Sequence, residues 1–231
     1  MATIINIDTS TEVCSVSLSK DGNLIGLKEN KDGLKHAQLV TLYIQDLLKE
    51  ANLEIKNLDA IAVSKGPGSY TGLRIGVSTA KGLCYGAQIP LIAISTLQAM
   101  SVDAINKSKN TEDDTWFCPM IDARRMEVFC AFYDKNNNIQ KDISAEIIDE
   151  KSFEEILNNR KVVFFGNGAE KCKNSITHKN AIFINNIKAS AVNMAALSNE
   201  SFINKQFEDV AYFEPFYLKD FVATTPKKKI L

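Results

Sequence analysis

The chain has 231 residues, of which 45% are apolar and 24% are charged, and its formal net charge at pH 7 is -1. This length allows one large or two small domains, and the composition is that of an ordinary globular protein. The near-neutral charge gives no electrostatic reason to expect direct binding of nucleic acid.

The expected compartment follows from what the sequence lacks. No apolar run reaches the length of a membrane span, and the start of the chain, MATIINIDTS, has no basic region of the kind that opens a signal peptide. The five cysteines are scattered without the spacing of a metal site, which is typical of reduced thiols in the cytosol. We therefore expect a cytoplasmic protein without membrane contact.

The chain opens with strand and turn signals. Strand-like runs occupy residues 3–7, 13–18 and 24–28, and the turn KDGN joins the last two. A small polar loop of Asp8, Thr9 and Ser10 follows the first run. The opening therefore predicts an antiparallel meander, whose polar loop is compatible with contact to a phosphate group and is a candidate vestigial phosphate loop.

Residues 36–52, HAQLVTLYIQDLLKEAN, predict a long helix. Its apolar side chains cover more than one narrow stripe, so we expect burial on two sides, by its own sheet and by a neighbour. The candidate partner-contact residues on this helix are His36, Leu39, Val40, Tyr43 and Leu47. His36 stands at the helix N-terminus, where the dipole disfavours a positive charge, so we expect it to pack or to form a hydrogen bond.

The block 61–86, IAVSKGPGSYTGLRIGVSTAKGLCYG, predicts a buried strand, a tight loop and a helix over 70–85. Each interior glycine costs a helix about 1 kcal/mol relative to alanine, so three of them indicate a use for bare backbone. Gly72, Gly76 and Ala80 recur every four residues and share one face, with Leu73 and Val77 beside them.

Three interpretations of this glycine-rich block remain open at this point. The small residues could form a docking surface for another helix, the loop could bind an anion at the helix N-terminus, or the helix could pack tightly on its own sheet. We favour the docking surface, with Gly72, Leu73, Gly76, Val77 and Ala80 as predicted partner-interface residues.

The remaining elements suggest a second lobe. A short strand over 91–94 and a helix to about 105 precede the polar segment 106–115, which is the best candidate linker. Further strands are expected over 116–121, 126–133, 139–148, 162–165 and 181–184, with helices over 152–158 and 190–199. We therefore divide the chain into lobes 1–108 and 109–231, with the last 20 or so residues expected to return to the first lobe.

The two halves resemble each other in the order strand, aspartate, strand and turn. IINIDTSTEVCSVSLSKDGNLI opens the first half, and MIDARRMEVFCAFYDKNNNI opens the second. Such a duplication predicts an α/β fold of two ribonuclease-H-like lobes with mixed sheets. This is the architecture of actin, sugar kinases and heat-shock ATPases.

Several motifs together resemble the bacterial TsaB family, also called YeaZ, over nearly the whole chain. They are IDTST, His36 at the head of its helix, KGPGSYTGLRIGVSTAKGL, IDARRMEVFCAFY, FFGNGA and PFYLKDFVA. The resemblance implies a noncatalytic paralogue of TsaD, the subunit that transfers the threonylcarbamoyl group to the adenosine beside the anticodon of tRNAs. It further implies binding to TsaD through helices of the first lobe, a related homodimer, and assembly with the ATPase TsaE.

The residues themselves agree with a noncatalytic role. TsaD-like enzymes hold a metal through two histidines one helical turn apart, and by position Thr96 and Met100 stand there in this chain. The only histidines are His36 and His178, and no local nucleophile motif such as GxSxG occurs. Arg124 could bind an anion, but a bulky hairpin suits ATP phosphates poorly.

The sequence therefore predicts a noncatalytic scaffold or activator that binds TsaD together with TsaE and meets tRNA only through that complex. We expect no catalytic residue, no metal and no cofactor, including ATP bound by this chain alone. A homodimer is possible. The alternative is an ATP- or metal-dependent hydrolase of the glycoprotease type, or a kinase, which Asp8 and the glycine loops would favour.

Overall fold

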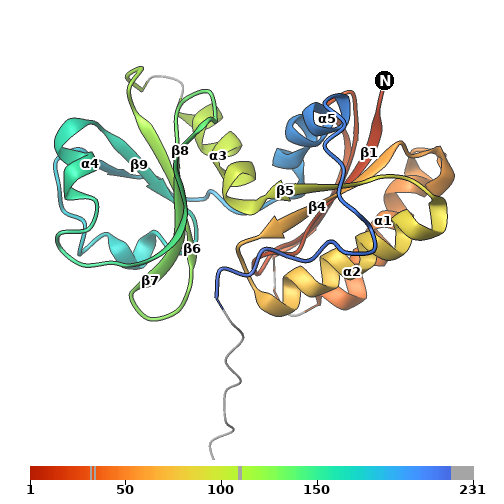
Figure 1. Ribbon diagram of the computed structural model, residues 1–231, viewed down its shortest axis with the longest axis horizontal. Coiled ribbons are helices and arrows are strands. Elements are labelled where there is room, and N and C mark those ends of the chain that lie inside the picture. The colour runs from red at the N-terminus through yellow and green to blue at the C-terminus, as the bar shows by residue number, and fades with distance from the viewer. Residues whose placement is uncertain (32, 34, 109–110, 220–231) are drawn as a thin grey trace, which may run out of the picture.

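The computed structural model describes residues 1–219 except 32, 34, 109 and 110, and it consists of two five-stranded mixed sheets flanked by helices (Figure 1). The first sheet holds β1 (Thr3–Asp8), β2 (Cys14–Lys20), β3 (Asn23–Asn30), β4 (Ala60–Gly66) and β5 (Leu91–Ser95). The second holds β6 (Trp116–Asp122), β7 (Glu127–Tyr133), β8 (Ile139–Ile147), β9 (Val162–Phe165) and β10 (Ala181–Phe183). The helices are α1 (His36–Glu50), α2 (Tyr70–Ala87), α3 (Thr96–Lys107), α4 (Glu154–Asn159) and α5 (Ala195–Ile203), with 3-10 turns η1 (Ile55–Asn57), η2 (Glu170–Cys172) and η3 (Ala191–Met194).

The two sheets repeat one topology. The strand order is β3-β2-β1-β4-β5 in the first sheet and, read from its β8 edge, β8-β7-β6-β9-β10 in the second. In both, the first strand pairs antiparallel with the second and parallel with the fourth. This duplicated order confirms the predicted two-lobed, actin-like α/β fold.

The central strands of the first sheet are buried on both faces. Ile5 and Ile7 of β1 belong to the core under α1 and α2, whereas Ile4 points to the opposite face, because successive side chains of a strand alternate. On β4, Ala60 and Ala62 face η3 and α5. Figure 1 shows α1 and α2 on one face of this sheet and α5 on the other.

The helices do not follow the predicted boundary at residue 108. Leu97, Met100 and Ala104 of α3 pack in the core of the second sheet, and only Ala99 among its described core residues packs on the first, although α3 lies in the first 108 residues. In the opposite direction, Met194 and the segment leading into α5 pack on the first sheet. The prediction missed this exchange because the apolar face of a helix does not specify which sheet covers it.

The described C-terminal residues 208–219, here called the strap, run along the first lobe. Glu208 N–H donates to Leu91 O at 2.9 Å, and Phe216 N–H donates to Lys65 O at 2.7 Å. Val210 and Phe213 pack against the core beneath α2. The rest of the segment expected to return to the first lobe, residues 220–231, lies outside the described part of the chain.

Among the described residues, no helix is long and apolar enough to cross a membrane.

Candidate interaction site

The buried face of α2 is built around the loop that follows β1. A Cβ atom added to Gly72 would lie 2.0 Å from Thr9 O, and one added to Gly76 would lie 2.3 Å from Thr9 Oγ1. The Thr9 hydroxyl donates to Gly72 O at 2.7 Å. The loop before the helix is equally close, since a Cβ on Gly68 would lie 2.2 Å from Ser10 O. The glycines therefore allow α2 to rest directly on this loop.

This geometry corrects one interpretation of the sequence. The expected spacing is real, because the residues predicted to share a face are all buried together: Gly72, Leu73, Gly76, Val77 and Ala80. That face meets the protein's own sheet and the loop after β1. The interpretation that it opens a surface for another protein is therefore wrong, and tight packing on the chain's own sheet accounts for the small residues.

The candidates on α1 divide in the same way. Val40 and Leu47 are buried in the first core, and Leu39 and Tyr43 are half-buried at its edge. The half-buried ring of His36 places Nε2 2.9 Å from Thr11 O, which agrees with the expected hydrogen-bonding role. Only the half-buried members of this set border the outer surface.

The candidate phosphate loop is internal. Asp8, Thr9 and Ser10 are each 1% exposed or less. Asp8 Oδ1 accepts hydrogen bonds from Ser10 N–H at 2.9 Å, the Ser10 hydroxyl at 2.6 Å and the Ser64 hydroxyl at 3.0 Å. Asp8 Oδ2 has no partner among the described residues, and burial raises the pKa of this carboxyl. In this conformation the loop is covered by residues 68–76, so these side chains do not fit a phosphate.

The corresponding turn of the second lobe, which follows β6, is exposed and is held by contacts of another kind. Arg124 and Arg125 have positive φ values of 73° and 48°, a backbone region that non-glycine residues rarely adopt. The Lys171 ammonium group donates to Arg125 O and Glu127 O, each at 2.7 Å, and forms an ion pair with Asp122. Lys171 thus ties this turn to the lobe.

Metal-ligand clusters and exposed thiols, two features that some hydrolases use, are absent from the described residues. No group of three or more His, Cys, Asp or Glu side chains could hold a metal ion within this part of the chain. All five cysteines are buried, and burial raises the pKa of the Cys84 thiol to about 12. Cys84 is therefore not an activated nucleophile in this environment.

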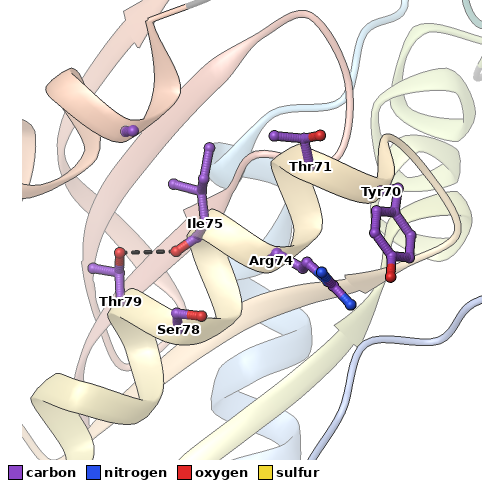
Figure 2. Close-up of a pocket in the computed structure, with 7 residues that line it drawn as sticks. Tyr70, Thr71, Arg74, Ile75, Ser78 and Thr79 are labelled. Atoms are coloured by element: carbon purple, nitrogen blue, oxygen red, sulfur yellow. Dashed lines mark hydrogen bonds between the residues drawn. The ribbon is translucent and has the colours of Figure 1, made fainter. Parts of the chain in front are cut away.

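The outer face of α2 carries a groove of about 620 Å³ (Figure 2). It is lined by Ala37 of α1 and by Tyr70, Thr71, Arg74, Ile75, Ser78 and Thr79 of α2. Among the described residues of this lining Arg74 alone is charged, and the Thr79 hydroxyl donates back along the helix to Ile75 O at 2.8 Å (Figure 2). Farther along the helix, a Cβ on Gly82 or Gly86 would meet nothing within 4 Å.

Sequence reasoning missed this outer face. Thr71, Ile75, Ser78 and Gly82 recur with helical spacing, as the buried stripe does. The signal that could have found them is the lack of charge along an exposed stripe of a surface helix. The inner glycines masked that signal, because small residues occupy both faces of α2.

The strap contacts two residues that line this groove, Tyr70 and Arg74. Arg74 Nε donates to the Tyr217 hydroxyl at 3.2 Å, and the Arg74 guanidinium carbon lies 4.2 Å from the centre of the Tyr70 ring. The two tyrosine rings are 4.8 Å apart. Nearer the C-terminal end of α2, Lys81 also holds the strap, because its ammonium group donates to Phe213 O at 2.8 Å. Tyr217 is 143 residues from Arg74 in sequence, so the pair has no local signature.

Comparison with known proteins identifies the family. A family model described as TsaD, tRNA N6-adenosine threonylcarbamoyltransferase, matches residues 31–227. The chain is also 30% identical over 230 residues to the tRNA threonylcarbamoyladenosine biosynthesis protein TsaB of Haemophilus influenzae, covering 94% of both proteins. The chain belongs to the TsaB family.

Other TsaB proteins and solved structures agree. Identity to Escherichia coli TsaB is 38% over 135 residues, which is 58% of this chain and 56% of that protein, so that match spans about half of the relative. The structure of YeaZ from Pseudomonas aeruginosa is 26% identical, covers 94% of this chain and 100% of its own, and superposes with a TM-score of 0.80. The resemblance of the motifs to the TsaB family is thereby confirmed.

In this TsaB-family chain, the most distinctive motif has an internal role. KGPGSYTGLRIG spans the end of β4, the loop and the first half of α2, and Gly68, Gly72 and Gly76 lie against the loop after β1. The outer face of the same helix is exposed at Thr71, Arg74 and Ser78. One motif therefore fixes the position of a helix whose opposite side is exposed.

Proposed function

We propose that this TsaB-family protein is a noncatalytic subunit that binds TsaD and supports the threonylcarbamoylation of adenosine beside the anticodon of tRNAs. TsaE joins the assembly, tRNA is met through the complex, and the protein works in the cytoplasm without a cofactor of its own. The observation that supports docking best is the groove on the outer face of α2, with one charged residue in its lining.

The composition of this face suits a protein contact. The centres of protein interfaces are depleted of charged side chains, and small residues let a second helix approach closely. Thr71 and Ser78 are exposed, Ile75 adds apolar area, and nothing lies near Gly82. The Leu42 side chain of the neighbouring α1 is 51% exposed and is a second apolar group at the surface of the helix pair. A second copy of the chain could use the same face.

Two observations support a noncatalytic role. The loop of Asp8, Thr9 and Ser10 is filled by the chain's own α2 segment, so phosphate contact would require that segment to move. The Cys84 thiol has a pKa of about 12, far above the range in which a thiolate attacks at neutral pH. The alternative of an ATP- or metal-dependent hydrolase or kinase predicts that the purified protein alone binds ATP with magnesium, which calorimetry measures directly.

The docking proposal is tested by Ser78→Trp, which fills the groove from an exposed position without touching the core. We expect affinity for TsaD of the same organism to fall roughly 10- to 100-fold, as for the loss of an interface hot spot. Isothermal titration calorimetry measures it. The matched control is Asn158→Trp, at an exposed position of helix α4 in the second lobe.

Equal affinities of Ser78→Trp and the wild type would rule out this face. Weakening by Asn158→Trp alone would move the contact to the second lobe. Analytical ultracentrifugation of the same proteins tests self-association through the face, because a dimer that uses it would also dissociate in Ser78→Trp.

A further inference from the structure

Arg74 is a surface cation without an acidic partner. Its Nε donates to the Tyr217 hydroxyl, and its guanidinium group lies over the Tyr70 ring. Within the part of the chain that the structure describes, no carboxylate forms an ion pair with it, and Glu214 contributes only a longer-range attraction. Twelve ion pairs occur among the described residues, and all of their side-chain cations are lysines.

The two tyrosines hold this cation in one orientation. Stacking on Tyr70 restrains the guanidinium plane, and the hydrogen bond to Tyr217 engages Nε, so the two terminal nitrogens remain for another acceptor. A planar guanidinium presented in this way matches a carboxylate through two parallel hydrogen bonds. Less side-chain entropy is lost on binding because the group is already ordered.

The surroundings favour a protein carboxylate over a nucleic-acid phosphate. Among the described residues that line the groove, Arg74 is the one cation and the others are uncharged, including Ala37 and Ile75. Binding to a nucleic-acid backbone requires several cations along the contact. A single charge in an otherwise uncharged groove instead fixes the register of a protein segment.

We propose that Tyr70, Arg74 and Tyr217 form a recognition site for an aspartate, glutamate or C-terminal carboxylate of the protein that docks in the groove of α2. The strap is then part of the binding site, because it supplies Tyr217. This inference rests on the proposed function and adds the chemistry of the partner's contact. It makes Arg74 a specificity-determining residue.

The experiment is calorimetric titration of TsaD with four Arg74 and Tyr217 variants and one control. Arg74→Gln keeps part of the side chain and removes the charge, and we expect affinity to fall roughly 10- to 100-fold, as for the loss of hydrogen bonds to a charged group. Arg74→Glu should bind more weakly still because it repels a carboxylate. Arg74→Lys, which retains the charge but not the planar fork, should bind better than Arg74→Gln.

Tyr217→Phe keeps the ring and removes only the hydroxyl acceptor, so it should weaken binding less than Arg74→Gln. The matched control is Arg160→Gln, because Arg160 lies 4.1 Å from the Trp116 ring in the second lobe and makes a similar stacked contact. It should bind as the wild type does. Thermal unfolding of each variant checks that the exposed substitutions leave the fold intact.

Wild-type affinity in Arg74→Gln would overturn the inference and leave the docking proposal standing. Equal affinities of Arg74→Glu and Arg74→Gln would show that the facing group is not an anion. If the Arg74 variants bound TsaD normally and only weakened tRNA binding by the assembled complex, the group that Arg74 recognises would be a phosphate. That result would also overturn the inference. If wild-type protein does not bind TsaD, both proposals fail.

Discussion

At the level of single residues, Asp8 shows how a catalytic-looking side chain can be structural. It is 1% exposed, and one of its oxygens accepts three hydrogen bonds while the other has none among the described residues. A buried carboxylate with so little compensation favours its protonated form. Burial accordingly raises the pKa of Asp8 above its ordinary value of 3.8, despite the opposing hydrogen bonds from Ser10 and Ser64.

This raised pKa predicts a pH-dependent stability with a definite sign. The folded state keeps the Asp8 proton to a higher pH than the unfolded state, so stability is lost as the pH rises from about 3.8 through the folded pKa. Asp8→Asn removes this titration. We expect the free energy of unfolding of the wild type minus that of Asp8→Asn to fall between pH 4 and 8, measured by urea denaturation.

A matched control comes from an exposed aspartate with the opposite shift. The Ser152 hydroxyl, which donates to Asp149, is the main cause of the lowered pKa of that carboxyl. Its stabilising contribution is present above the ordinary pKa and lost as the pH falls, so the same difference for Asp149→Asn should not decrease over this range. A flat difference for Asp8→Asn would show that Asp8 is ionised in the folded protein.

At the level of elements, α2 shows what helical spacing can and cannot predict. The four-residue spacing of Gly72, Gly76 and Ala80 correctly predicts a common face. It does not say what meets that face, because a protein's own backbone and another protein's helix both require small residues. The deciding fact is the position of Thr9, which is 63 residues from Gly72 and reaches it only through the pairing of β1 with β4.

The two faces of α2 predict opposite responses to alanine. Gly76→Ala places a methyl group 2.3 Å from the buried Thr9 Oγ1 and should destabilise the protein by about 1–3 kcal/mol, as overpacking does. Gly82→Ala meets nothing within 4 Å and should stabilise it by up to about 1 kcal/mol, because alanine is the better helix former. Urea denaturation compares the two variants. Equal effects would mean that α2 does not rest on the loop as described.

At the level of the whole molecule, the hydrophobic cores divide the chain into lobes at other positions than the boundary predicted at residue 108. Both clusters of the second lobe lie within residues 96–189, including Leu97, Met100 and Ala189. The first lobe combines residues 1–95 with the segment after 189, which supplies Met194 and Phe213, and α3 adds Ala99 to its core. In terms of chain order, the second lobe is inserted into the first.

This arrangement predicts which fragment folds. Residues 96–189 contain the second sheet with α3 and should unfold cooperatively on heating, as followed by circular dichroism. Residues 109–219 lack Leu97, Met100 and Ala104 and carry α5 without its sheet, so they should not form a cooperative core. The reverse result, with 109–219 the more stable fragment, would contradict the assignment of α3 to the second lobe.

The duplication of the two lobes could be predicted from the sequence, because the pattern of strand, aspartate, strand and turn recurs around Asp8 and Asp122. Each of these runs has the length and composition of a strand. The sequence could not place the helices α3 and α5, whose apolar faces fit either sheet. Nor could it bring Tyr217 to Arg74, because the two residues meet only when the strap runs along α2.

The strap also couples two equilibria. If its attachment through Tyr217 improves docking by some free energy, docking must strengthen the attachment by the same amount, because linkage between two binding events is reciprocal. The strap is held to α2 chiefly by hydrogen bonds from Lys81 and Arg74 and by the packing of Val210 and Phe213. Residues 208–219 should therefore become better protected against amide hydrogen exchange when a partner occupies the outer face of α2.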